Sequence, residues 1–265
     1  GTATVPGREI FKENDLKKIG RNIDIRVARE KLHPSDDAKS KLGSAEIIGR
    51  IRKDMLRDGG RDAVILIHGY NYTFRESMVR AAQIGQWLHE IDPVMLTFAW
   101  PSLGQGVAPK SYSDERKRAE AAGNALGRAV LKAADYLRRV QREENCNGRV
   151  HLMAHSMGNW ALRGGVQFMR TFVGDNIPPL FDQVILTAAD EDDDTLGNHM
   201  KIAPLLRGCK RLTAYYCAQD AALKASDWVM GNPDRLGLSG PEDMETLPPK
   251  VSAVNVSPVI AWEPA

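Results

Sequence analysis

The sequence has little of what would direct it to a membrane or to a nucleic acid. None of its apolar runs reaches 18 residues, so we expect no transmembrane helix within these 265 residues. The 36 basic and 34 acidic residues leave a formal net charge of only +2. A balance this even creates no field that would attract nucleic acid or an anionic membrane surface. The composition therefore gives no argument for a nucleic acid or a membrane surface as the partner.

Cysteine is also scarce, and its arrangement argues against a disulfide framework. The three residues are Cys146, Cys209 and Cys217, so they cannot all pair. Cys209 and Cys217 flank one predicted strand, and the rise of an extended chain would hold them roughly 25 Å apart. A disulfide needs a far shorter separation. We interpret all three as free thiols, which favours a reducing compartment, the cytoplasm, over the periplasm or secretion.

Short apolar runs separated by longer helical stretches dominate what is present. Hydrophobic residues make up 43% and charged residues 26% of the chain, which are ordinary values for a globular protein. Near-continuous apolar runs are typical of parallel strands covered on both faces. We predict such strands at residues 63–67, 93–100, 149–155, 181–189, 211–217 and 251–257.

The stretches between these strands have helical spacing of their apolar residues. One covers about 78–88, one about 114–144 with Asp114 as its N-cap, and one begins just after Ser156. Strands that alternate with helices predict an α/β fold with a mostly parallel central sheet and helices on both faces.

The organisation of the chain predicts one domain over residues 1–265, with a catalytic core at about 60–257. Residues 22–28 (NIDIRVA) alternate in polarity, which indicates an antiparallel edge strand within the extension formed by residues 1–59. The Pro- and Gly-rich stretches 101–109 and 231–249 are interpreted as loops off the sheet.

The segment RVHLMAHSMGNWALRGGVQFM places Ser156 between a predicted strand and a predicted helix. This is the pattern of a nucleophile elbow, G-x-S-x-G, with Ala154 in place of the first glycine. The sharp turn brings the positions two before and two after the serine together, so Ala154 and Gly158 must leave room. An ordinary strand-to-helix turn with an inert serine is the alternative interpretation.

A second segment, AVILIHGYNYTF, places Gly69 directly after a buried strand. A glycine here lets the backbone turn the N–H of Tyr70 toward the serine. With the N–H of Met157, it would form an oxyanion hole, which is a large contributor to catalysis of acyl transfer. We interpret the His68 side chain as structural and assign the function to the backbone amides.

A catalytic acid is expected where a later strand ends. Asp220 follows the strand that ends near Cys217, and Asp190 follows the preceding strand. Asp190 begins the carboxylate run 190–194, whose simplest interpretation is a solvated loop in which Asp194 caps a helix. Asp220 is therefore the preferred acid and Asp190 the alternative.

Taken together, these segments resemble a known family. HGYNYTFRESMVRAAQIGQWL, FAWPSLG, SYSDERKR, HLMAHSMGN, TAADEDDD and YCAQDAAL are similar to the bacterial α/β-hydrolase family DUF900, described as members of the esterase/lipase superfamily. The resemblance covers roughly residues 60–230. It implies an α/β-hydrolase fold with Ser156 as nucleophile and Asp220 as the triad acid, and it aligns Asp190 and Asp192 with the family's acidic pair.

The resemblance also implies a histidine after the last strand, and none follows Asp220 here. The six histidines are His33, His68, His89, His151, His155 and His199. His155 precedes the nucleophile, so we expect its side chain to point away from the catalytic face. His199 is a weak candidate because it follows the strand that ends near Asp190. A C-terminal segment absent from the sequence, an unusual base at His199, or a hydrolase fold without catalysis are the three explanations, and we favour the first.

The sequence therefore predicts a serine hydrolase that cleaves a small-molecule or lipid-like carboxylic ester through an acyl-enzyme at Ser156. This chemistry requires neither a metal nor an organic cofactor. An acyltransferase or an amidase would use the same residues, and a non-catalytic hydrolase-fold binding protein is the alternative from another class. The sequence does not predict the oligomeric state.

Overall fold

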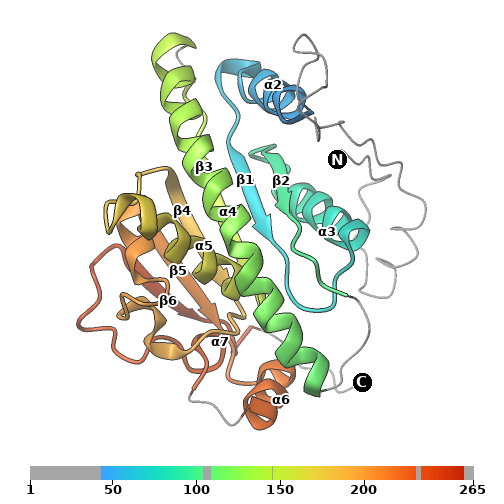
Figure 1. Cartoon of the computed structure of the whole chain (residues 1–265), viewed down its shortest axis with the longest axis vertical. Helices are drawn as coiled ribbons and strands as arrows, with labels where there is room; N and C mark the ends of the chain where they lie inside the picture. The colour runs from blue at the N-terminus through green and yellow to red at the C-terminus, as the bar shows by residue number, and fades with distance from the viewer. Residues whose placement is uncertain (1–42, 104–108, 145, 231–233, 260–265) are drawn as a thin grey trace.

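The structure, a computed structural model, describes residues 43–103, 109–144, 146–230 and 234–259. Figure 1 shows the arrangement of its helices and strands. In chain order they are α2 (Gly43–Met55), the 3-10 turn η1 (Arg57–Gly59), β1 (Ala63–Ile67), α3 (Phe74–Trp87), β2 (Val94–Phe98), α4 (Pro109–Glu144), β3 (Val150–His155), α5 (Gly158–Val173), β4 (Phe181–Thr187), the 3-10 turns η2 (Asp193–Leu196) and η3 (Ala203–Gly208), β5 (Cys209–Tyr216), α6 (Ala221–Met230), α7 (Leu236–Ser239) and β6 (Val251–Asn255).

The strands form one six-stranded sheet in the order β2-β1-β3-β4-β5-β6. Every neighbouring pair is parallel. All six predicted strands are present, with ends that differ by a few residues at most. The parallel sheet and the alternation of strands with helices confirm the predicted α/β-hydrolase fold.

Helices cover the sheet on both faces. On one face, Leu66 of β1 packs with Ala81 and Ile84 of α3. On the other, the larger core joins Ile67 of β1 and Leu152 of β3 to the apolar sides of α4 and α5. Because successive side chains of a strand point to opposite faces, the near-continuous apolar runs of β1 and β3 can serve both layers.

Helix α4 is longer than the sequence predicted. It begins at Pro109, so the prediction that Asp114 caps it is wrong, since Asp114 lies inside the helix. Proline is favoured in the first turn, where its missing N–H has no helical partner. The single-turn helix α7 also lies within the stretch 231–249 that was predicted to be loop. The predicted edge strand 22–28 and His33 lie outside the described residues.

The three cysteines are free, as the sequence predicted, and all three are buried. Cys209 is the first residue of β5 and Cys217 follows the last. Among the described residues, no helix combines the length and the apolar character needed to cross a bilayer.

Candidate functional site

Parallel strands bring the predicted site residues to one edge of the sheet. β1 ends just before His68, β3 ends just before Ser156, and β4 ends at Thr187. The registers align Ile67 with Ala154, and His155 with Thr187. The loops after β1, β3, β4 and β5 therefore leave the sheet together, at the edge where open α/β sheets bind their ligands.

Ser156 has the strained backbone of a nucleophile elbow. Its φ is 50°, in the left-handed region that side chains other than glycine rarely adopt, at a cost of about 1–3 kcal/mol. Its N–H donates to the carbonyl of Thr187 at 3.0 Å. Its carbonyl accepts from the backbone N–H of Asn159 at 3.1 Å and of Asp190 at 3.3 Å. The Asn159 side-chain amide donates to the same carbonyl at 2.8 Å, so the turn is anchored from several directions.

Two glycines allow neighbouring loops to approach this turn. A Cβ on Gly69 would lie 3.0 Å from the Ser156 Cβ and 2.8 Å from His155 Nδ1. A Cβ on Gly158 would lie 2.5 Å from the carbonyl oxygen of His68. Real Cβ atoms do not approach backbone atoms as closely as 2.5 Å, so Gly158 requires glycine, whereas a side chain at Gly69 would force the His155 ring to move. The small residue expected at Gly158 is explained by this contact with the end of β1.

His68 supports the loop after β1. Its ring is buried and stacks on Trp100 with ring centroids 5.1 Å apart. Its Nδ1 donates to the carbonyl of Gly69 at 2.9 Å, and the Trp100 indole N–H donates to the His68 carbonyl at 2.7 Å. Burial lowers the pKa of His68. These contacts agree with the structural role that we expected for this side chain.

The Asp190 carboxylate is held in a buried polar network. Asp190 is fully buried, Tyr112 Oη donates to its Oδ2, and Arg235 Nε lies 3.6 Å from its Oδ1. Arg235 is itself fully buried and also donates to Asp192 Oδ1 at 3.0 Å. Asp190 and Asp192, which follow β4, thus hold the segment around Arg235 through ion pairs.

The neighbouring carboxylates continue this network. Asp192 accepts a hydrogen bond of 2.7 Å from Lys201 Nζ, which also pairs with Asp194. Glu191 is fully buried, and Arg163 Nη1 lies 3.6 Å from its Oε1. Burial, aided by the charge of Asp192 and opposed by Arg163, raises the pKa of Glu191 to about 7. The run 190–194 was predicted to be a solvated loop, and this prediction is wrong for its first two residues, which are fully buried.

Asp220 lies at the same sheet edge with its carboxylate less constrained. It is half-buried and directly precedes α6. Its Oδ1 accepts the N–H of Leu223 at 3.0 Å, which is the bonding of a helix N-cap. The negative charge of Asp220 favours the protonated form of His155 and so opposes the lowering of the pKa of that histidine by burial.

His155 faces the α3 side of the sheet. It lines a largely apolar cavity of about 400 Å³ together with Gly69, Arg80 and Thr187. Burial, followed by the charge of Arg80, lowers the pKa of His155 to about 4 despite the opposing charge of Asp220. A general base is most effective with a pKa near the working pH, so this imidazole is a weak proton acceptor.

The structure does not bring His199 to Ser156. Its carbonyl accepts a hydrogen bond of 2.8 Å from Arg170, and its Nδ1 is 3.8 Å from Asp175. Arg170 lies in the last turn of α5, roughly 18 Å along the helix axis from Gly158. Among the described residues, no histidine forms a hydrogen bond with Ser156.

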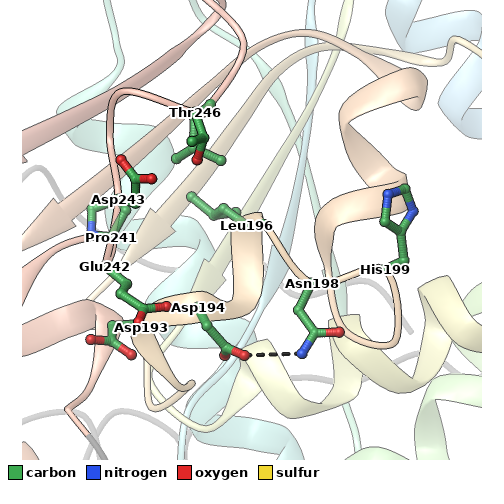
Figure 2. A pocket seen from close by; sticks show the side chains of 11 residues that line it. Asp193, Asp194, Leu196, Asn198, His199, Pro241, Glu242, Asp243 and Thr246 are labelled. Atoms are coloured by element: carbon green, nitrogen blue, oxygen red, sulfur yellow. Dashed lines mark hydrogen bonds between the residues drawn. The ribbon is translucent and has the colours of Figure 1, made fainter.

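His199 instead borders an acidic pocket of about 690 Å³ near η2 (Figure 2). Asp193, Glu242 and Asp243 supply carboxylates to its wall. Burial and the charge of Glu242 raise the pKa of Asp193. This pocket does not include Ser156, so the acidic run contributes to two separate environments.

Sequence reasoning missed the residues that hold the site in place. Arg235 lies in a stretch predicted to be loop, and no spacing in the sequence links it to Asp190 or Asp192. The Tyr112–Asp190 bond joins residues 78 positions apart. Asn159 was the one detectable signal, because an amide three residues after Ser156, in the first turn of a helix, is placed to bond back to that turn.

Comparison with known proteins agrees with this architecture. A search of curated proteins found no match to the chain. Residues 44–261 match the model of a family described as α/β hydrolases of unknown function (DUF900). Because this match covers most of the sequence, the chain belongs to the DUF900 family of α/β hydrolases.

Proposed function

We propose that the protein is a serine hydrolase that cleaves carboxylic esters through an acyl-enzyme at Ser156. The observation that carries the proposal is the turn itself. A serine with φ of 50° stands between a parallel strand and a helix N-terminus, with the loop at Gly69 packed against its Cβ. The strained backbone of Ser156 costs free energy, which four hydrogen bonds to the turn offset. An inert serine would not require such a conformation.

In the proposed first step, Ser156 Oγ attacks the ester carbonyl and gives up its proton to a base. The new Oγ–C bond forms, and the N–H groups of Tyr70 and Met157 stabilise the oxyanion. Collapse breaks the C–O bond to the alcohol, which leaves with the proton from the base. Water then attacks the acyl-enzyme, and the same base accepts its proton before the carboxylic acid is released and Ser156 is restored.

Asp220 is the acid in this proposal, and Asp190 is a positioning residue. One oxygen of Asp220 caps α6, and the other oxygen is available to orient an imidazole. Asp190 is already engaged by Tyr112 and Arg235. We assign the base to none of the described histidines, because the pKa of His155 is lowered to about 4, His199 lies at the far end of α5, and His68 is held by its loop.

Labelling of the full chain with a fluorophosphonate probe, combined with hydrolysis of p-nitrophenyl butyrate, tests the proposal. Ser156→Ala should abolish both, whereas Ser252→Ala, an exposed serine of β6, should leave both unchanged. Label that persists in Ser156→Ala, or a folded wild-type chain that neither labels nor turns over ester, would overturn the proposal.

The two candidate acids are distinguished by matched variants. Asp220→Asn keeps the cap on α6 but cannot stabilise an imidazolium, so labelling should fall by about 10³–10⁴-fold with little change in Tm. Asp190→Asn should mainly lower Tm, because it weakens buried ion pairing. The reverse pattern would assign the acid to Asp190.

A non-catalytic binding protein is the second candidate. It is favoured by one observation, that no histidine among the described residues reaches Ser156. A well-folded chain that binds short-chain esters without labelling or turnover would support it. An acyltransferase or amidase would label at Ser156 and would differ in transferring the acyl group to an added alcohol or in cleaving anilides.

A further inference from the structure

The cavity on the α3 side of the sheet begins at the loop that packs against the proposed nucleophile. Gly69 lines this cavity, and a Cβ on Gly69 would lie 3.0 Å from the Ser156 Cβ. His155, the residue before the nucleophile, lines it as well. The volume of about 400 Å³ falls within the range of pockets for small molecules. The cavity is therefore placed to receive one part of a molecule that reacts at Ser156.

Most of the cavity wall is apolar. The sheet contributes Leu66 of β1 and Met153 of β3, and α3 contributes Ile84 and Trp87. Trp87 leaves 52% of its surface exposed, although an indole side chain gains free energy when it is removed from water. A hydrocarbon chain in the cavity would contact these side chains and would leave water together with them.

Arg80 is the only charged residue that lines the cavity among the described residues. It is half-buried, its Nη1 donates to Gln83 Oε1 at 2.9 Å, and its Nη2 donates to Tyr72 Oη at 3.0 Å. Both partners are neutral, and Arg80 forms no ion pair within the described part of the chain. A guanidinium has five N–H donors, so donors and an uncompensated positive charge remain for a ligand.

The electrostatics at His155 have the same sign. The charge of Arg80 lowers the pKa of His155 more than the charge of Asp220 raises it, and burial lowers this pKa further, to about 4. The imidazole is therefore neutral, and it forms no hydrogen bond with a described residue. A neutral imidazole donates one N–H, so it can bind an anion together with Arg80. The other imidazole of the wall, His68, bonds to the carbonyl of Gly69 through Nδ1, and its Nε2 is buried.

We propose that this cavity holds the acyl chain of a half-ester of a dicarboxylic acid, with the free carboxylate at Arg80. The inference rests on the proposed hydrolysis at Ser156, because it names the substrate class of that reaction. The acyl chain is assigned to the cavity because its carbonyl carbon bonds to Ser156 Oγ, whereas the alcohol departs. The planar guanidinium offers paired donors to the carboxylate, and the reaction releases a dicarboxylate and the alcohol.

The experiment compares p-nitrophenyl half-esters of the acids from adipic to sebacic with neutral p-nitrophenyl esters of equal acyl length. The measured quantity is the ratio of kcat/KM for the half-ester to kcat/KM for its neutral counterpart. We expect a preference for the half-ester on the order of tenfold at the best chain length. This is the lower end of what a hydrogen bond to a charged group provides, because Arg80 is half-exposed.

The cation is tested with matched variants. Arg80→Gln should lower the ratio about tenfold, and Arg80→Lys, which keeps the charge but not the planar donor pair, should restore part of it. Arg118→Gln, an equal change of charge at an exposed position of α4, should leave the ratio unchanged. A preference that persists in a folded Arg80→Gln variant would overturn the inference.

The position of the chain is tested at the end of α3. Leu88 lines the cavity, so Leu88→Phe should shift the best half-ester to a shorter acid. His89→Phe, at the exposed neighbouring position, should leave the chain-length profile as it is in the wild type. An identical profile for Leu88→Phe and the wild type would show that the acyl chain lies elsewhere.

Binding to a variant that cannot turn over substrate separates this inference from the proposed function. Calorimetric titration of Ser156→Ala with monomethyl suberate should show binding that Arg80→Gln in the same background weakens about tenfold. A wild type that labels and cleaves neutral esters without preferring half-esters would overturn the inference and leave the hydrolysis intact. A chain that neither labels nor turns over ester, but binds monomethyl suberate through Arg80, would overturn the hydrolysis and retain the cavity as a carboxylate site.

Discussion

Replacing Gly158 by alanine should damage both the stability and the reactivity of the elbow. The new Cβ would lie 2.5 Å from the His68 carbonyl oxygen and 2.7 Å from that of Ile67. Both are backbone atoms at the end of β1, so the clash cannot be relieved by rotating a side chain. Forced overpacking of this kind costs about 1–3 kcal/mol, which corresponds to a decrease in Tm of roughly 2–12 °C for a chain of this size.

The change should also displace the loop that follows β1. Because His68 is two residues from Tyr70, movement of the strand end shifts the proposed Tyr70 N–H donor relative to Ser156. Loss of one oxyanion donor lowers the rate of acyl transfer by about 10²–10³-fold, and fluorophosphonate labelling should slow accordingly. Thermal unfolding and labelling rates are measured on the same preparation.

Gly49→Ala provides the matched control. Gly49 lies in α2, and a Cβ added there would have no other atom within 4 Å. Alanine should stabilise this helix by up to about 1 kcal/mol, since glycine is the poorer helix former. If Gly158→Ala behaved like Gly49→Ala, with an unchanged or higher Tm and normal labelling, the close approach of β1 to the elbow would be refuted.

Three further predictions concern buried charge. Arg235→Met leaves the buried carboxylate of Asp190 and the partly buried carboxylate of Asp192 without their shared cation, and we expect a loss of about 3–5 kcal/mol in chemical denaturation; an unchanged midpoint would contradict the pairing. The pKa of Glu191 is raised to about 7, so the folded protein retains a proton that the unfolded chain releases between about pH 4.5 and 7. The unfolding free energy should therefore fall by about 3 kcal/mol as pH rises through this window, and Glu191→Gln should remove that fall when compared with wild type at pH 5 and 7.5. The pKa of His155 is lowered to about 4, so its imidazole should stay neutral above about pH 5 and contribute stability that is lost as pH falls from about 6.5 through 4; titration of its ring protons by NMR checks this, and a midpoint near 6.5 would disprove the burial argument.

The strands could be predicted from sequence because each carries its own signal. β1 and β3 are covered on both faces, so their residues must be apolar almost continuously, and the run AVILI is sufficient to locate β1. The elbow was also predictable, because a serine held at positive φ requires small neighbours close in sequence. Gly158 is one such neighbour, although the contact that requires it is with the end of β1, which is distant in the sequence.

The polar network could not be predicted because its contacts join distant segments. Asp192 and Arg235 are 43 positions apart, and nothing near Arg235 distinguishes it from a surface cation. The sequence of a carboxylate run such as 190–194 does not reveal whether its charges are hydrated by solvent or paired with a buried arginine. The start of α4 was misplaced for a different reason: a proline such as Pro109 ends a helix at most positions, but the first turn accepts it.

The electrostatics of the two aspartates argue for a division of labour at this sheet edge. A triad acid acts by stabilising the imidazolium that forms when the serine loses its proton. Arg235, 3.6 Å from Asp190 and fully buried, already compensates that charge, so a second cation nearby would gain little from it. Asp220 forms no ion pair of this kind within the described residues, and its charge is felt at His155 beside the nucleophile. The uncompensated carboxylate is therefore suited to catalysis, while the compensated one is suited to holding the backbone N–H of Asp190 against the carbonyl of Ser156.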